Sequence, residues 1–171
     1  MLYLIIAAAV VLLDQLSKHL LTRFLAGGSA PLIPGLVRLV YVENSGAAFS
    51  MLSNQRWTLI AASSVAIVLI LLALYAYREQ VGRPACLALA FVLGGAVGNL
   101  IDRLLFGYVA DFFEFEFVNF AVFNVADIFI TLGGIAFLIF YLLHPGQKKE
   151  EIAAPEGETP EAKAGSDDAA D

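Results

Sequence analysis

The sequence has very little of the residue types from which metal centres and covalent cross-links are built. Cys86 is the only cysteine in 171 residues, so neither an intramolecular disulfide nor a cysteine-based zinc site can form, and we expect Cys86 to have a packing role. The two histidines, His19 and His144, are not part of a His-Glu-x-x-His motif, which excludes the zinc-peptidase site of that type. We therefore expect no metal and no cofactor.

Charge is scarce as well, and the acidic excess lies mainly at the C-terminal end. Charged residues make up 15% of the chain, against roughly 25% in an ordinary soluble domain. Residues 144–171 contain eight of the sixteen acidic residues and three of the ten basic ones, and they cannot bury a core, so we predict a disordered acidic tail. Residues 1–143 carry eight acidic and seven basic side chains, which leaves no basic stripe for a nucleic acid.

Apolar side chains, in contrast, make up 60% of the residues. They form four long segments, at about 2–25, 57–77, 84–106 and 122–143. Each is close to the ~20 residues that a helix needs to cross a ~30 Å hydrocarbon core. We therefore predict an all-α membrane protein, with four transmembrane helices in a domain that covers residues 1–143.

Two features of the first third of the chain refine this prediction. The first apolar segment could be read as a cleaved signal peptide, but no Lys or Arg precedes it and Asp14 and Lys18 interrupt it, so we expect a permanent helix. The segment 26–56, between the first two spans, contains the β-prone run Val37–Val42. We predict a small β-rich segment there, outside the membrane.

The basic residues near the ends of the spans give a weak indication of orientation. On the side of the tail they are Arg78, Arg83, Lys148 and Lys149. On the opposite side they are Arg23, Arg38 and Arg56. The tendency of basic residues to stay inside favours a cytoplasmic tail, but the second group weakens that inference.

Several polar residues lie within or beside the apolar segments, where burial in lipid is costly. Asp14 and Lys18 are four residues apart on one helical face, and we expect them to form a structural ion pair. The others lie near the two ends of the loop that joins the third and fourth spans: Asn99, Asp102, Arg103, Asp111, Asn124 and Asp127. Alternating topology therefore places Lys18, Asn44 and this group at one membrane face.

Two of these segments share the pattern Asn-x-x-Asp, at 99–102 and 124–127. In a helix this spacing stacks an amide on a carboxylate, so that the amide can orient the acid. Two carboxylates that face each other share one proton; the ionised one can then activate water while the protonated one polarises a peptide carbonyl. Such a pair predicts an aspartic peptidase, although spacing alone does not say which aspartates form it.

Other interpretations of the polar cluster are a Ser-Lys peptidase, a transporter and a scaffold. A Ser-Lys pair would use Ser45 or Ser50 with Lys18. A small polytopic transporter or proton relay would also need intramembrane acids, but its polar residues should continue to the other face, and the 57–77 segment is almost entirely apolar. In a noncatalytic scaffold the aspartates would be replaceable.

Five motifs, in order along residues 1–143, resemble those of the lipoprotein signal peptidases, also called signal peptidase II. They are Asp14-Gln15-Leu16-Ser17-Lys18, Asn44-Ser45-Gly46-Ala47-Ala48-Phe49-Ser50, Gly98-Asn99-Leu100-Ile101-Asp102-Arg103, Val109-Ala110-Asp111-Phe112 and Phe123-Asn124-Val125-Ala126-Asp127. Any one of them would be a weak signal, and the five together are specific.

The resemblance implies a role for each polar residue. The catalytic aspartates of the family fall in the last two motifs, at Asp111 and Asp127. The family also implies that Asn44 and Arg103 contact the substrate and that Asn99 and Asn124 shape the site. Asp102 then becomes a supporting residue, which we expect to pair with Arg103, and it joins Asp14 and Lys18 as structural.

The resemblance also implies a substrate and a location. The substrate would be a prolipoprotein whose cysteine already carries diacylglycerol, cleaved just before that cysteine. The protein would be a monomer among the lipids of the bacterial inner membrane, with its termini and tail in the cytoplasm and its active site at the outer leaflet. Family inhibitors such as globomycin would bind at the aspartates. The segments 26–56 and 112–117 would cradle or cover the substrate.

Overall fold

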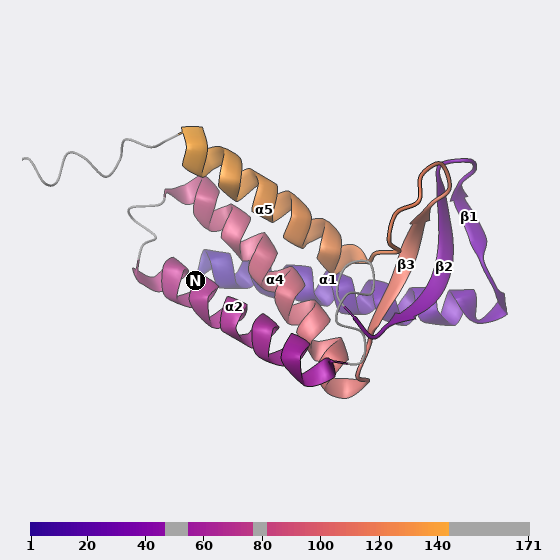
Figure 1. Cartoon of the computed structure of the whole chain (residues 1–171). Helices are drawn as coiled ribbons and strands as arrows, with labels where there is room; N and C mark the ends of the chain where they lie inside the picture. Colours follow the sequence, from indigo (N-terminus) through magenta and orange to yellow (C-terminus); the bar gives the residue numbers. More distant parts are fainter. Residues whose placement is uncertain (47–54, 77–81, 144–171) are drawn as a thin grey trace, which may run out of the picture.

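The computed structural model describes residues 1–46, 55–76 and 82–143 (Figure 1). Some of the predictions above concern residues outside these ranges. They are the end of the second motif with Ser50, the basic residues Arg78, Lys148 and Lys149, His144, and the predicted disordered tail at 144–171.

Four long helices confirm the four predicted spans. They are α1 (Leu2–Phe24), α2 (Arg56–Ala76), α4 (Arg83–Leu105) and α5 (Val125–Leu143). At a rise of ~1.5 Å per residue, each is long enough to cross the apolar part of a bilayer. Three of them begin and end within one residue of the prediction, whereas α5 begins three residues later than expected, because the chain from Ala121 to Asn124 is not helical. A short 3₁₀ turn, Leu25–Gly27, extends α1.

Helix α4 is the centre of the bundle and packs against the other three helices. The glycines of α4 allow its backbone to approach the neighbouring helices closely. A Cβ atom at Gly94 would lie 2.6 Å from Cβ of Val10, and one at Gly95 would lie 2.5 Å from the carbonyl oxygen of Ala126. Half of the most apolar part of α4 is buried, compared with 6% for α2. The polar residues of α4 are therefore shielded from lipid by α1 and α5.

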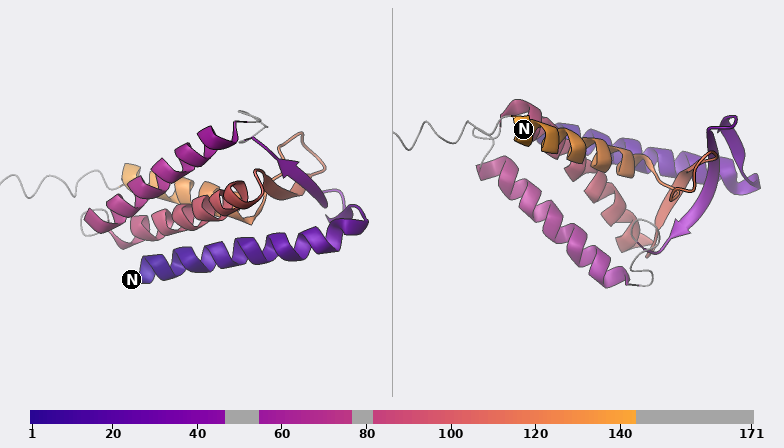
Figure 2. Two further views of the ribbon diagram at one scale, coloured as in Figure 1. Left: turned by 90° about the horizontal axis from the view of Figure 1, so that it is seen from below. Right: turned by 45° about the horizontal axis from the view of Figure 1, so that its top comes forward.

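A three-stranded antiparallel sheet lies at one end of the bundle, over the C-terminal part of α1 (Figures 1 and 2). Strands β1 (Ala30–Ile33) and β2 (Val37–Asn44) form a hairpin within the predicted β-rich segment. The third strand, β3 (Val109–Phe115), comes from the loop between α4 and α5 and pairs with β2. Alternation in the sequence indicates an extended segment at β3 but not its pairing with β2. That pairing covers one edge of β2.

A small apolar cluster fixes the sheet to the helices. Leu25, Leu39 and Phe112 are buried together, and Leu21 of α1 packs against them. Phe112 has no exposed surface, so it belongs to this core and cannot cover a substrate, contrary to what we expected for the first residue of the 112–117 run.

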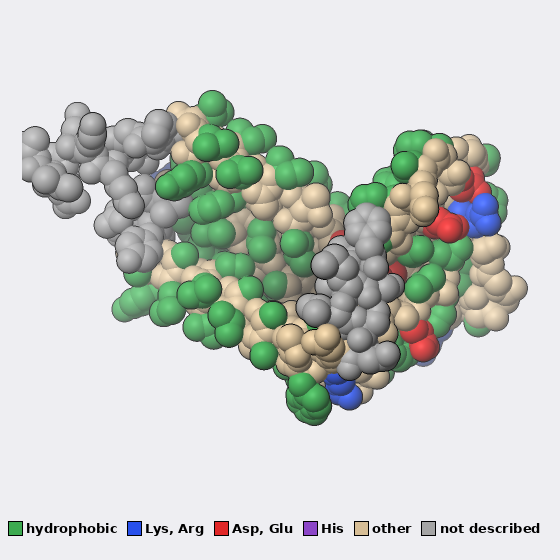
Figure 3. Space-filling model, viewed as in Figure 1, with side chains coloured by type: hydrophobic (Ala, Val, Ile, Leu, Met, Phe, Trp, Pro, Cys, Tyr) green, Lys and Arg blue, Asp and Glu red, His purple; other side chains and the backbone are tan. Residues whose placement is uncertain are grey.

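Figure 3 shows how side-chain types divide over one face of the molecule. Apolar side chains cover the helices, whereas acidic and basic side chains gather at the end that carries the sheet. This distribution agrees with the predicted clustering of polar residues at one membrane face.

Candidate active site

Asp111 is held at the junction of the sheet and the bundle. It lies on β3, where the register places it opposite Val42 of β2. Asn44, at the end of β2, donates from Nδ2 to Oδ2 of Asp111 over 2.9 Å. Asn124 donates from Nδ2 to Oδ1 over 2.7 Å. Only 1% of Asp111 is exposed, so two neutral amides supply the hydrogen bonds that water would otherwise make.

Asp127 is held by the start of α5. The main-chain N–H of Asn124 donates to Oδ2 of Asp127 over 3.1 Å, and the N–H of Asp127 donates to Oδ1 of Asn124 over 3.0 Å. These reciprocal bonds form a capping box, with Asn124 as the helix cap and an aspartate three residues later. Asn99 of α4 donates from Nδ2 to Oδ1 of Asp127 over 2.8 Å. The carboxylate orientation is thus fixed from two helices.

Asn124 links the two aspartates. Its Nδ2 donates to Asp111 and to Oδ1 of Asn99 (3.2 Å), while its Oδ1 accepts from Asp127. The side chain has no exposed surface. Within 124–127 the two side chains bond to each other's main-chain N–H groups, and the side-chain amide of Asn124 orients Asp111 instead of Asp127. In the 99–102 segment the amide orients Asp127 of α5 and not its own neighbour Asp102.

The environment of Asp111 alters its acidity. Burial, together with the negative charge of Asp127, raises the pKa of its carboxyl to about 6, against the lowering effect of the hydrogen bonds from Asn44 and Asn124 and of the charge of Lys18. A carboxyl group with this pKa changes its protonation state near neutral pH, which is what general acid–base catalysis requires.

A second polar cluster, around Lys18, lies beside this pair. Nζ of Lys18 is 2.8 Å from Oδ2 of Asp14 and 2.9 Å from Oδ2 of Asp102, and it donates to Oδ1 of Asn99 over 3.0 Å. The predicted ion pair between Asp14 and Lys18 is confirmed. The three hydrogens of the ammonium have three acceptors, so Lys18 is placed to neutralise acids and not to serve as the base of a Ser-Lys pair.

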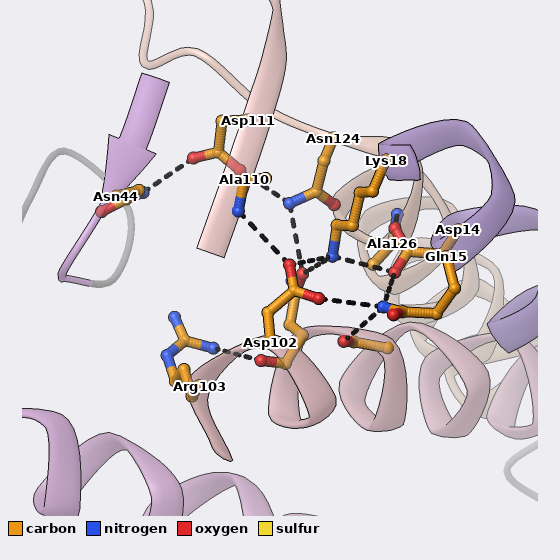
Figure 4. A network of polar contacts seen from close by, with 12 residues as sticks. Asp14, Gln15, Lys18, Asn44, Asp102, Arg103, Ala110, Asp111, Asn124 and Ala126 are labelled. Carbon is orange, nitrogen blue, oxygen red and sulfur yellow. Dashed lines mark hydrogen bonds and ion pairs between the residues drawn. The ribbon is translucent and has the colours of Figure 1, made fainter. Parts of the chain in front are cut away.

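The expected pairing of Asp102 with Arg103 is wrong. Consecutive residues of a helix point about 100° apart, and Figure 4 shows Asp102 turned toward α1 and Arg103 turned away from it. Oδ1 of Asp102 accepts from Gln15 over 2.9 Å, and Oδ2 accepts from the N–H of Ala110 over 3.3 Å. Asp102 thus braces the start of β3, next to Asp111.

Arg103 reaches toward the end of β2 instead. Its Nη2 donates to the carbonyl oxygen of Gly46 over 2.9 Å, and Nη1 lies 3.5 Å from the carbonyl oxygen of Asn99. Among the described residues, the buried Nε of Arg103 has no hydrogen-bond partner. It remains available to donate to a bound molecule.

A cavity of about 770 Å³ connects these groups. Its polar wall consists of Asn44, Asn99, Arg103, Asp111 and Asp127. The rest of the wall is mainly apolar and comes from α2, α4, α5 and the aromatic segment before α5, including Phe115, Phe120 and Phe123. A cavity with a polar end and an apolar body suits an apolar chain that carries one reactive polar bond.

Two residues that hold the site together were missed from the sequence. Gln15 donates to Asp102 and to the carbonyl oxygen of Gly98; its place within the first motif was the only signal. Arg56 donates to two main-chain carbonyl oxygens at the end of α4, and nothing in its spacing indicated this contact. Within the described part of the chain, no three His, Cys, Asp or Glu side chains are grouped so that they could hold a metal ion.

Comparison with known proteins gives consistent matches. The sequence model of the family described as signal peptidase (SPase) II matches residues 6–143. A Brevibacillus brevis protein named lipoprotein signal peptidase is 45% identical over 142 residues, covering 82% of this chain and 95% of that protein. One of the same name from Streptococcus pyogenes serotype M1 is 42% identical over 132 residues, covering 75% and 85%. A solved structure described as a bacterial membrane enzyme has a TM-score of 0.78 at 28% identity, covering 86% of this chain and 92% of that one.

Proposed function

The chain belongs to the signal peptidase II family, and we propose that Asp111 and Asp127 are its two catalytic aspartates. The protein is an aspartic endopeptidase that removes the signal peptide from prolipoproteins. The observation that carries the proposal is the placement of two carboxyl groups in the polar wall of one cavity, joined through Asn124.

The pair acts as a unit that holds one proton. The ionised carboxylate takes a proton from water as the water oxygen attacks the scissile carbonyl carbon, and the protonated carboxyl group donates its proton to the carbonyl oxygen. When the C–N bond breaks, the proton taken from water passes to the leaving amine nitrogen, and as the C=O bond forms again the hydroxyl proton returns to the other carboxylate, so that the pair again holds one proton. Because the two carboxyl groups titrate together, the proton belongs to the pair and is not assigned to either residue.

The neighbouring polar residues have separate roles in this proposal. Arg103, with its unpartnered Nε–H, and Asn44 contact the main chain of the substrate. Asn99 and Asn124 hold the carboxylates, and Asp14, Lys18 and Asp102 form a structural support.

The substrate is a prolipoprotein whose cysteine carries diacylglycerol, and cleavage occurs just before that cysteine. A lipid-anchored peptide bond lies at the membrane interface, and Asp111 and Asp127 lie where β3 and α5 meet the ends of the spans. The apolar body of the cavity can take the signal peptide, with Phe115, Phe120 and Phe123 along its wall. This face is the outer-leaflet side of the bacterial inner membrane.

We propose that the enzyme is a monomer. An inhibitor such as globomycin would occupy the same cavity and contact both aspartates.

The test follows cleavage of a diacylglyceryl-modified prolipoprotein by the purified protein in detergent. We expect Asp111→Asn and Asp127→Asn each to lower kcat by about 10³-fold or more, because each removes a proton-transferring group. Glu114→Gln is the matched control, since Glu114 lies on the same strand as Asp111 but pairs with Arg38 on the far side of the sheet. Normal turnover by either folded aspartate variant would exclude the proposed pair.

A further inference from the structure

We infer that Arg56 is a positioning residue of this peptidase: by holding the last turn of α4, it keeps Arg103 and the start of β3 in place beside the cavity. The inference rests on the catalytic pair proposed above. Arg56 is the first residue of α2, and the start of α2 lies next to the end of α4 (Figure 1).

The guanidinium group of Arg56 makes two hydrogen bonds to the main chain of α4. Nε donates to the carbonyl oxygen of Arg103 over 2.9 Å, and Nη2 donates to that of Leu104 over 2.8 Å. The last carbonyl groups of a helix have no partner within it, and a cation is favourable beside them. The planar fork of an arginine matches two successive carbonyl groups better than a lysine can.

The position of Arg56 is not explained by the needs of its own helix. A cation at a helix N-terminus is unfavourable, and the first turn of α2 contains no acidic residue to offset it. The hydrogen bonds to the α4 carbonyl groups explain why an arginine stands at this position. The ring of Trp57 also contacts the guanidinium group, whose carbon lies 5.5 Å from the ring centroid.

The turn that follows α4 is also built against Arg56. Gly107 has φ +88°, and a Cβ atom there would lie 3.3 Å from Nη1 of Arg56. Two residues later β3 begins, and it carries Asp111. Arg56 therefore lies against both the last turn of α4 and the turn that leads to β3.

Arg103 is consequently held at two points. Its main chain is bound by Arg56, and its side chain binds the carbonyl oxygen of Gly46. Arg103 lines the cavity together with both aspartates, whereas Arg56 lies outside the described lining. A change at Arg56 should thus disturb Arg103, which contacts the substrate, and the strand that carries Asp111, while the apolar wall of the cavity stays in place.

The test compares the full-length protein with Arg56→Ala, Arg56→Lys and Arg83→Ala in detergent. Arg83 is the matched control, because it is an exposed arginine at the other end of α4. We expect Arg56→Ala to lower kcat by about 10- to 100-fold and to raise KM by a smaller factor, because the apolar wall still binds the signal peptide. Arg56→Lys should recover at least about threefold of that loss, because a lysine reaches one carbonyl group. Arg83→Ala should leave kcat within about twofold.

A separate binding measurement distinguishes positioning from loss of folded protein. In the Asp127→Asn background, the diacylglyceryl-modified prolipoprotein should bind with the same stoichiometry whether residue 56 is Arg or Ala, and the Kd should rise by a smaller factor than kcat falls. A binding stoichiometry that falls in proportion to kcat would overturn the inference, and so would an unchanged kcat in Arg56→Ala. If Asp127→Asn itself still cleaves, the catalytic pair fails first and this inference fails with it.

Discussion

Two clusters of buried carboxylates lie side by side at the same end of the bundle, and they differ in what surrounds each acid. In the cluster around Lys18, the carboxylates of Asp14 and Asp102 lie within 3 Å of an ammonium group. In the cluster around Asn124, the carboxylates of Asp111 and Asp127 accept hydrogen bonds from side-chain amides and a main-chain N–H.

This difference in surroundings distinguishes acids suited to a supporting role from acids suited to proton transfer. A buried cation favours the charged form of the acids that it contacts. An acid bound by amides can gain or lose a proton without leaving a buried cation unpaired. The same residue type, a few ångströms apart, thus serves two purposes according to its neighbours.

Replacing Lys18 should have the largest effect on stability. Lys18→Met leaves Asp14 and Asp102 buried without their cation, so we expect the free energy of unfolding to fall by about 3 to 5 kcal/mol. Asp111→Asn, in contrast, removes a charge from a buried site and should keep or raise the thermal midpoint while activity is lost. Thermal unfolding of both variants in the same detergent makes the comparison. Equal midpoints for Lys18→Met and wild type would mean that the two clusters do not differ in this way.

The pH dependence of cleavage should report the amide-bound cluster. Because burial and the charge of Asp127 raise the pKa of Asp111 to about 6, the pair loses its shared proton as the pH rises through that value, and kcat/KM should decline on the alkaline side with an apparent pKa near 6. Asn44 donates to the carboxylate, so it favours the ionised form. Asn44→Ala should therefore raise this apparent pKa and move the alkaline limb to higher pH.

The profiles of wild type and Asn44→Ala, measured on one substrate, check the direction of this shift. Asn44→Asp is unsuitable as a control, because it adds a charge; Asn44→Gln keeps the amide donor and should restore part of the wild-type profile. An alkaline limb that moves to lower pH in Asn44→Ala would contradict the role given to this hydrogen bond.

The smallest effect is expected at the ion pairs on the outside of the sheet. Arg38 bonds to Glu116 over 2.8 Å and lies 3.9 Å from Glu114, with nearly half of its side chain exposed. Exposed pairs contribute little, so Arg38→Ala should leave the thermal midpoint within about 2 °C and kcat within about twofold. A large loss of turnover would instead assign the sheet surface a part in substrate binding.

Much of the fold follows from the sequence because the bilayer imposes strict conditions. Each span needs a fixed length, and alternating topology brings both ends of the loop between α4 and α5 to one face. The pairing of β3 with β2 was not predicted, because it joins segments about 70 residues apart whose alternation indicates a strand but not its partner.

The site was predicted less completely, for a related reason. The position of Asp14 four residues before Lys18 is local, and their ion pair could be foreseen. The choice of Lys18 over Arg103 as the partner of Asp102 depends on how α1 docks on α4, which local spacing does not encode. The contact of Arg56 with the end of α4 is equally non-local. The assignment of Asp111 and Asp127 as catalytic came from the family motifs and stays a prediction.

The docking of α5 on α1 has a consequence for how the enzyme is made. The main-chain N–H of Ala126, next to Asp127, donates to Oδ1 of Asp14 over 3.0 Å. This hydrogen bond joins the start of α5 to α1. Synthesis proceeds from the N-terminus, and α1 and α4 are in place before α5 arrives. Until then the cavity lacks Asn124 and Asp127 and holds only one acid of the proposed pair. We therefore expect a partly inserted chain to lack hydrolytic activity and the peptidase to become active only when the bundle is complete.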